Sequence, residues 1–151
     1  MCLVATLLVS PLRDWLHEPA LIRLRRMCGL FTFFYASLHT LAWAWWQQNF
    51  VPIDMLLDVF ERPFVSVGLA AFLVLLAMAL TSSQRAMRAM GRYWKALHRW
   101  IYLAAILSIV HYWLHKAGKN DFSDVMIYGA VVAVLLGWRL WQRWRPKPNH
   151  P

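Results

Sequence analysis

Three histidines lie in or at the edge of long apolar stretches of this 151-residue chain: His39, His98 and His111. An ionisable side chain at membrane depth is costly, so such a residue is a candidate functional residue. Neutral imidazole is also a common ligand of transition metals and of haem iron. The three histidines therefore predict a metal or haem site inside a membrane protein, provided that the surrounding segments place them at suitable depths.

Four apolar segments predict helices that cross a membrane. The chain is 60% apolar and 15% charged, against about 45–50% and about 25% in soluble domains. A transmembrane helix needs about 20 apolar residues, and Met27–Gln48 and Pro63–Gln84 reach this length without a charge. Ala96–His115 and Val125–Trp144 reach it when their Trp and Arg flanks are counted as interfacial ends. We therefore predict an all-α integral membrane bundle with four complete transmembrane helices.

The N-terminal segment Met1–Leu12 is apolar but too short to span a membrane. It has neither the basic leader nor the small-residue cleavage site of a signal peptide, and Pro11-Leu-Arg-Asp is expected to end it. We interpret it as the end of a helix whose first part is missing. The bundle is thus expected to contain a partial N-terminal helix as well, in a chain truncated at its N-terminus.

The basic residues fall mainly in alternate loops. Of the 16 Lys and Arg residues, thirteen lie in segments 13–26 and 81–99 and in the tail from residue 139, and three lie in loops 47–62 and 116–124. Because basic loops mark the cytoplasmic side, we predict a multi-pass protein with a cytoplasmic C-terminus. Contact with anionic membrane lipid then explains the net charge of +9, and no nucleic-acid partner is expected.

His39 and His111 are predicted to lie at one level of the bundle. Both helices run outward in this topology, and both residues lie in the outer half of their helix. Two imidazoles on neighbouring helices at one depth suit a haem with two axial histidines, whereas zinc would need further protein ligands. The alternative is that each histidine only hydrogen-bonds a neighbouring helix.

His98 lies 13 residues before His111, about 20 Å nearer the cytoplasm on a continuous helix. Arg25 and Arg26 share this inner level and could bind haem propionates, a flavin phosphate or a quinone oxygen. On an ideal helix the two histidines would point about 140° apart, so a single column of cofactors would require a bend. The other histidines lie at the interface or in polar ends and are not expected to be ligands: His17, His115 and His150.

Several short motifs are similar to those of a known family: Arg25-Arg-Met-Cys-Gly-Leu, Tyr35, Thr81-Ser, Trp94-Lys-Ala-Leu-His-Arg, Tyr102 and His111-Tyr. From Pro11 to about Trp144 the chain resembles the MsrQ (YedZ) family. These are haem-binding membrane subunits of bacterial protein-methionine-sulfoxide reductases, within the ferric-reductase-like transmembrane group. The resemblance implies a ferric-reductase-like transmembrane domain over residues 1–145 and a cytoplasmic tail over 146–151, in the bacterial inner membrane. Family members have six transmembrane helices, more than are predicted here.

The resemblance also implies a function. Electrons would pass from the quinone pool or a cytosolic flavin reductase, through haem b, to a periplasmic molybdenum-cofactor enzyme that reduces methionine sulfoxide. The haem histidines of the family match His39, His98 and His111, which leaves one or two haems open. FMN is also attributed to the family, but no residue of this chain places it.

Two other functions remain open from the residues. The chain could be a ferric or cytochrome b561-like reductase whose acceptor is a metal ion, or a haem-free scaffold or transporter. Its membrane helices show no candidate nucleophilic cysteine, carboxylate pair or molybdenum ligand, so we expect an electron-transfer subunit and not the site of sulfoxide chemistry. The acidic side chains of the outer loop, Asp54, Asp58 and Glu61, predict a docking surface for a basic partner.

Overall fold

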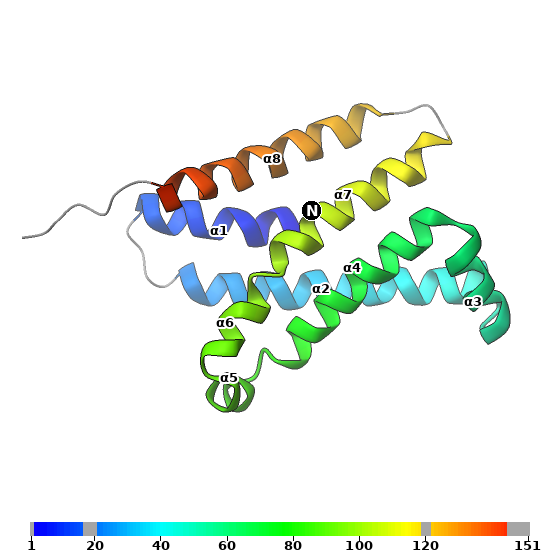
Figure 1. The fold of residues 1–151 in the computed structure, drawn as a ribbon, viewed down its shortest axis with the longest axis horizontal. Coiled ribbons are helices and arrows are strands. Elements are labelled where there is room, and N and C mark those ends of the chain that lie inside the picture. The colour runs from blue at the N-terminus through cyan, green and yellow to red at the C-terminus, as the bar shows by residue number, and fades with distance from the viewer. Residues whose placement is uncertain (1, 17–20, 119–121, 145–151) are drawn as a thin grey trace, which may run out of the picture.

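The computed structural model describes residues 2–16, 21–118 and 122–144, and these residues form helices without any strand. In order they are α1 (Cys2–Leu16), α2 (Leu21–Trp46), α3 (Pro52–Glu61), α4 (Pro63–Leu80), α5 (Gln84–Met90), α6 (Arg92–His98), α7 (Ile101–Ala117) and α8 (Ser123–Trp144). Figure 1 shows the long helices lying alongside one another, with α3 at one end and the short α5 and α6 at the other. The prediction of an all-α bundle is confirmed.

Three stretches of the described chain are long and apolar enough to cross a membrane: Arg23–Trp46, Pro63–Leu80 and Ser123–Gln142. They lie in α2, α4 and α8, and correspond to three of the four predicted spans. The fourth, α7, has 17 residues, which gives a length of about 25 Å.

The prediction of one continuous helix over Ala96–His115 is wrong, because the chain breaks between α6 and α7. At the break, the amide of Arg99 donates to Ala96 and the amide of Trp100 donates to Leu97. These are the tighter bonds of a 3₁₀ turn, which often marks a change of helix direction. His98 and His111 therefore lie on separate helices, and the angle expected for an ideal helix does not apply.

The first helix is longer than predicted. Pro11 lies inside α1, which continues to Leu16, so Pro11 does not end it. An internal proline removes one backbone hydrogen bond, and α1 packs extensively on α2. The hydroxyl oxygens of Thr6 and Thr32 lie 3.4 Å apart in this buried interface.

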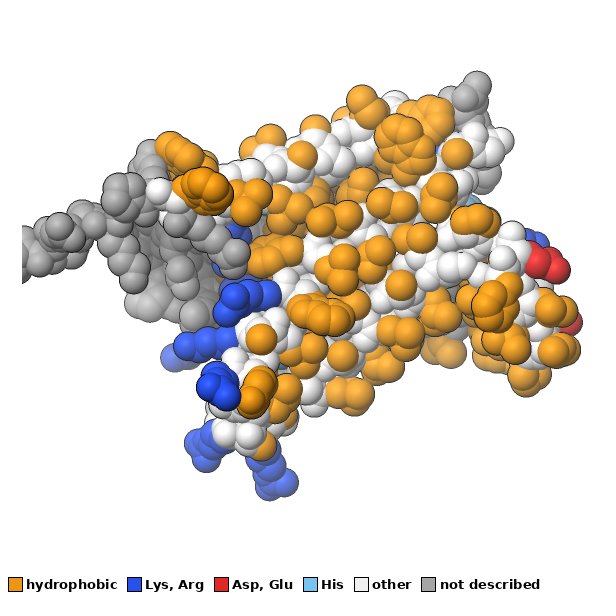
Figure 2. Space-filling view, viewed as in Figure 1, with side chains coloured by type: hydrophobic (Ala, Val, Ile, Leu, Met, Phe, Trp, Pro, Cys, Tyr) orange, Lys and Arg blue, Asp and Glu red, His pale blue; other side chains and the backbone are white. Residues whose placement is uncertain are grey.

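The main contacts of the bundle join α1 to α2 and α4 to α7, and α2 also packs on α4 and α7 on α8. The core is small and includes the fully buried Ala104 and Ala105 of α7. Small residues allow helices to approach closely, as is common in membrane bundles. Most large apolar side chains lie on the surface instead, and they cover it in Figure 2. This distribution is expected where lipid, not water, surrounds the helices.

Charge is separated between the two ends of the bundle. Figure 2 shows Lys and Arg side chains gathered around α5 and α6, and acidic side chains at the opposite end near α3. This separation follows the loop pattern of the sequence. Which end faces the cytoplasm stays a prediction.

The expected acidic docking surface needs a correction at Asp58. Its side chain is buried in the structure: the Trp43 indole Nε1 donates to Oδ2 at 3.0 Å, and Arg62 Nε lies 2.8 Å from Oδ1. Asp58 thus joins α3 to α2 and cannot contact a partner. Asp54 and Glu61 remain exposed on α3, next to an exposed apolar stripe made of Ile53, Leu56, Leu57 and Phe60.

Candidate functional site

The structure brings His39 of α2 and His111 of α7 together. The centroids of the two imidazole rings lie 6.1 Å apart, and the ring planes are inclined at 81°. Helix α4 mediates this arrangement, because it packs on both α2 and α7. His39 is exposed and His111 is half-buried. The two residues thus lie at one level of the bundle, and their role as metal ligands stays a prediction.

His111 is held in a defined orientation by α4. Its Nδ1 lies 2.7 Å from the backbone carbonyl oxygen of Phe64. A carbonyl oxygen only accepts hydrogen bonds, so Nδ1 must carry the proton. The other ring nitrogen, Nε2, then keeps its lone pair for a metal. A hydrogen bond of this kind from the non-ligating nitrogen is typical of metal-bound histidines.

The distance between the two ring centroids is compatible with a metal held between two imidazoles. A metal–nitrogen bond to histidine is about 2 Å long, and the centre of an imidazole ring lies about 1 Å beyond its ligating nitrogen. Two imidazoles on opposite sides of one metal would therefore have their ring centroids about 6 Å apart. Among the described residues, no group of three or more His, Cys, Asp or Glu side chains could hold a metal ion. A bare ion would lack ligands here, whereas haem brings four of its own, so the donor set fits haem iron better.

Apolar and aromatic residues precede His39 along α2, and the Phe64 ring contacts His111. Phe34, Tyr35 and Leu38 precede His39 on α2, and all three side chains are exposed on the surface of the bundle. The centroid of the Phe64 ring lies 6.2 Å from that of the His111 ring and 5.5 Å from that of the exposed His115 ring. Such surfaces suit the flat apolar faces of a porphyrin.

His98 forms a separate group at the basic end of the bundle. Its ring stacks on Trp94 at a centroid distance of 4.0 Å, and its Nδ1 lies 3.2 Å from the Trp94 carbonyl oxygen. Trp94 is itself fixed, because its indole donates to the carbonyl of Thr81 at 2.9 Å. Burial lowers the pKa of His98, and the nearby positive charge of Arg25 lowers it further, against the opposing hydrogen bonds to backbone groups. Arg25 and His98 thus lie close enough to interact.

The other candidates are less closely placed. Arg26 is exposed on α2, and the structure does not assign it to either group of histidines. His17 and His150 lie outside the described residues.

Sequence reasoning missed Phe64 and Gly68, the residues of α4 against which His111 packs. A glycine in a long apolar run was a signal for close approach. The sequence does not give the register between α4 and α7, so the partner could not be named.

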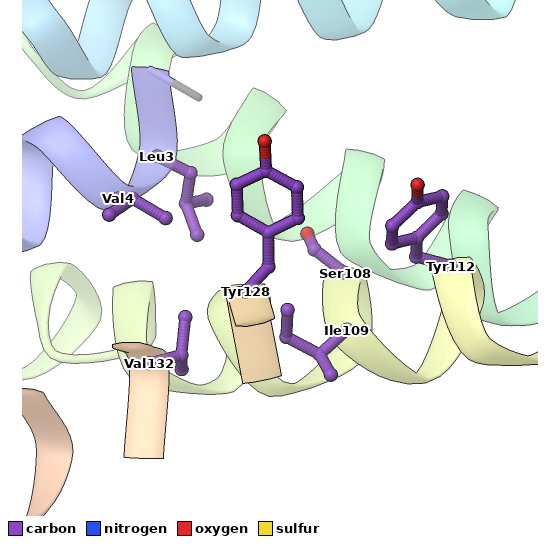
Figure 3. Close-up of a pocket in the computed structure, with 7 residues that line it drawn as sticks. All are labelled: Leu3, Val4, Ser108, Ile109, Tyr112, Tyr128 and Val132. Carbon is purple, nitrogen blue, oxygen red and sulfur yellow. The ribbon is translucent and has the colours of Figure 1, made fainter. Parts of the chain in front are cut away.

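An apolar space lies between α1, α7 and α8 (Figure 3). It is lined by Leu3, Val4, Ser108, Ile109, Tyr112, Tyr128 and Val132. Tyr112 and Tyr128 are neighbours, with ring centroids 6.4 Å apart. The Ser108 hydroxyl donates to the Ala104 carbonyl within α7. The space is mainly apolar, and its polar groups are hydroxyls.

The sequence of the chain is similar to those of known proteins. Residues 1–109 match the family described as ferric reductase like transmembrane component. A protein of Bordetella pertussis named protein-methionine-sulfoxide reductase heme-binding subunit MsrQ is 55% identical over 145 residues, which cover 96% of this chain and 70% of the relative. The chain belongs to the MsrQ family. The resemblance seen in its motifs is therefore confirmed.

Other MsrQ proteins are similar over nearly the same part of the chain. The identity is 49% for that of Ralstonia nicotianae, over 95% of this chain and 66% of the relative. It is 40% for that of Xanthomonas campestris, over 93% of this chain and 64% of the relative. No solved structure matches the chain.

Proposed function

We propose that this chain is the haem-binding, electron-transferring membrane subunit of a methionine-sulfoxide reductase system, with His39 and His111 as axial ligands of a haem b. The observation that supports it most is the pair of imidazoles at 6.1 Å on two helices, in a family whose relatives are named heme-binding subunits. Bound haem would supply reversible one-electron chemistry. His39 and His111 would both hold the haem iron, which favours electron transfer over the binding of small ligands.

At the inner end, His98 and Arg25 are proposed to bind a second group. Their proximity and the basic surroundings favour a group that accepts hydrogen bonds from cations: a propionate of a second haem, a phosphate of FMN, or a quinone oxygen. Arg26 is the neighbouring exposed cation that could join them. One haem or two would be compatible with this arrangement.

The proposed path runs across the bacterial inner membrane. The quinone pool or a cytosolic flavin reductase would deliver electrons to the basic end, and the acceptor would be a periplasmic molybdenum-cofactor subunit that reduces methionine sulfoxide. The exposed Asp54 and Glu61 lie at the acidic end, where such a partner would dock. Lipid would cover the apolar sides of the bundle.

Reoxidation of the haem tests the proposed direction of transfer. The full chain is purified in detergent without oxygen, reduced with dithionite just to completion, and mixed with the catalytic subunit of a related system and a methionine-sulfoxide substrate. With the enzyme well below the haem concentration, we expect the reduced haem bands to disappear fully only when enzyme and substrate are both present, because the enzyme alone can accept only a few electrons. Reoxidation by ferric citrate but not by this pair would favour a ferric reductase. A folded but colourless chain would favour a haem-free scaffold.

A further inference from the structure

Gly68 of α4 lies directly against the ring of His111. A β-carbon built on Gly68 would be 2.7 Å from His111 Nδ1 and 2.8 Å from Cε1. Real β-carbons essentially never approach other atoms this closely. The imidazole thus occupies the space that any side chain at position 68 would need.

Among the glycines in the described helices, only Gly68 shows this close approach. A β-carbon on Gly29 or Gly137 would meet nothing within 4 Å, and one on Gly129 would make an ordinary contact of 3.8 Å with Ile109. A glycine inside a helix costs about 0.5–1 kcal/mol relative to alanine. At Gly68 the structure shows a specific use for the missing side chain.

The missing side chain also uncovers a hydrogen-bond acceptor. In an α-helix the carbonyl of Phe64 accepts the amide of Gly68, four residues later. A carbonyl oxygen has a second lone pair, and without a side chain on Gly68 the ring of His111 can reach it at 2.7 Å. One helix thereby supplies both the space for the imidazole and the acceptor that fixes its protonated nitrogen.

We propose that Gly68 is a positioning residue for His111: by leaving the Phe64 carbonyl open, it fixes the ring in the Nδ1–H tautomer and aims Nε2 at the metal. This inference rests on the proposed function, since the metal is the haem iron. A carbonyl that accepts from a ligating imidazole raises the basicity of that ligand and strengthens its bond to the metal. Helix α4 therefore tunes the site although it contributes no ligand.

The variant Gly68→Ala tests this role, with Gly137→Ala as the matched control and Gly129→Ala as a second. For Gly68→Ala we expect haem affinity to fall about 10–100-fold, the usual effect of losing an outer partner of a ligand. The haem that remains should be partly high-spin, with a higher midpoint potential. Both controls should keep the haem content, spin state and potential of the unchanged chain.

A packing role alone would give a different result. The α4–α7 interface is extensive, so Gly68→Ala could lower the unfolding temperature of the chain whatever the role of His111. A lowered unfolding temperature with unchanged haem affinity, spin state and potential would overturn the proposal.

A second measurement needs neither a variant nor bound haem. Nitrogen-15 NMR of the full chain, labelled at histidine and prepared without haem, reports the tautomer of each ring, and His111→Gln identifies the signal. We expect the Nδ1–H form for His111. An Nε2–H form would overturn the proposal even if Gly68→Ala fails to fold. If the unchanged chain binds no haem but shows the Nδ1–H form, the proposed function fails while the positioning of His111 stands.

Discussion

Replacing either His39 or His111 by alanine is expected to lower the haem content of the purified chain at least about tenfold. Losing a group that only hydrogen-bonds a metal ligand already costs about 10–100-fold in affinity, and losing the ligand itself should cost no less. The two imidazoles come from different helices and lie 6.1 Å apart. Among the described residues, no group of three or more His, Cys, Asp or Glu side chains could hold a metal ion. Haem that remains should be high-spin, because one axial position is open. Reduced-minus-oxidised absorption spectra measure both effects.

His115→Ala is the matched control for this prediction, since His115 lies one turn beyond His111 on α7 and is exposed. It should leave the low-spin spectrum unchanged. Adding free imidazole to His39→Gly should restore part of that spectrum by filling the vacated axial position. If His39→Ala or His111→Ala keeps the spectrum of the unchanged chain, the replaced histidine is not a haem ligand.

Replacing Asp58 by alanine is expected to destabilise the chain by about 1 kcal/mol, the lower end of the cost of leaving a buried donor without its partner, because this donor is only partly buried. The donor is the Trp43 indole, which binds Asp58 Oδ2 at 3.0 Å. The ion pair with Arg62 should add little, because the Arg62 side chain is 50% exposed. Thermal unfolding followed by circular dichroism measures the loss.

Asp54→Ala is the control, as Asp54 lies on the same helix with its side chain exposed, and its unfolding temperature should hardly change. The double variant with Trp43→Phe should recover part of the loss, because the unpaired indole donor is removed as well. Equal unfolding temperatures for Asp58→Ala and Asp54→Ala would mean that the buried bond does not hold α3 in place.

The long helices could be predicted because they follow directly from length and apolar content. Pro63–Leu80 is the clearest case, an uncharged run that begins directly after the charged Glu61-Arg62 pair and ends at a polar Thr-Ser pair. The matched level of His39 and His111 followed from the same helices and the alternation of basic loops. The prediction used one-dimensional quantities only, the distance along each helix and the direction in which it runs.

The remaining features depend on tertiary packing, which the sequence pattern does not contain. Asp58 was predicted to be a surface acid, and only the contact between α3 and α2 shows that the Trp43 indole buries it. The break at Arg99 and the continuation of α1 through Pro11 were likewise not predicted from the sequence pattern. Gly68 acquires its meaning only when the register places it against His111.

The electron paramagnetic resonance spectrum of the oxidised haem in the detergent-purified chain tests the axial pair of His39 and His111 most directly. We predict a low-spin ferric signal, of the strongly anisotropic kind that two imidazoles with nearly perpendicular planes produce, as the angle of 81° implies. It should vanish in both His39→Ala and His111→Ala. A high-spin signal from the unchanged chain, or a folded chain without haem, would contradict a haem held between these two histidines.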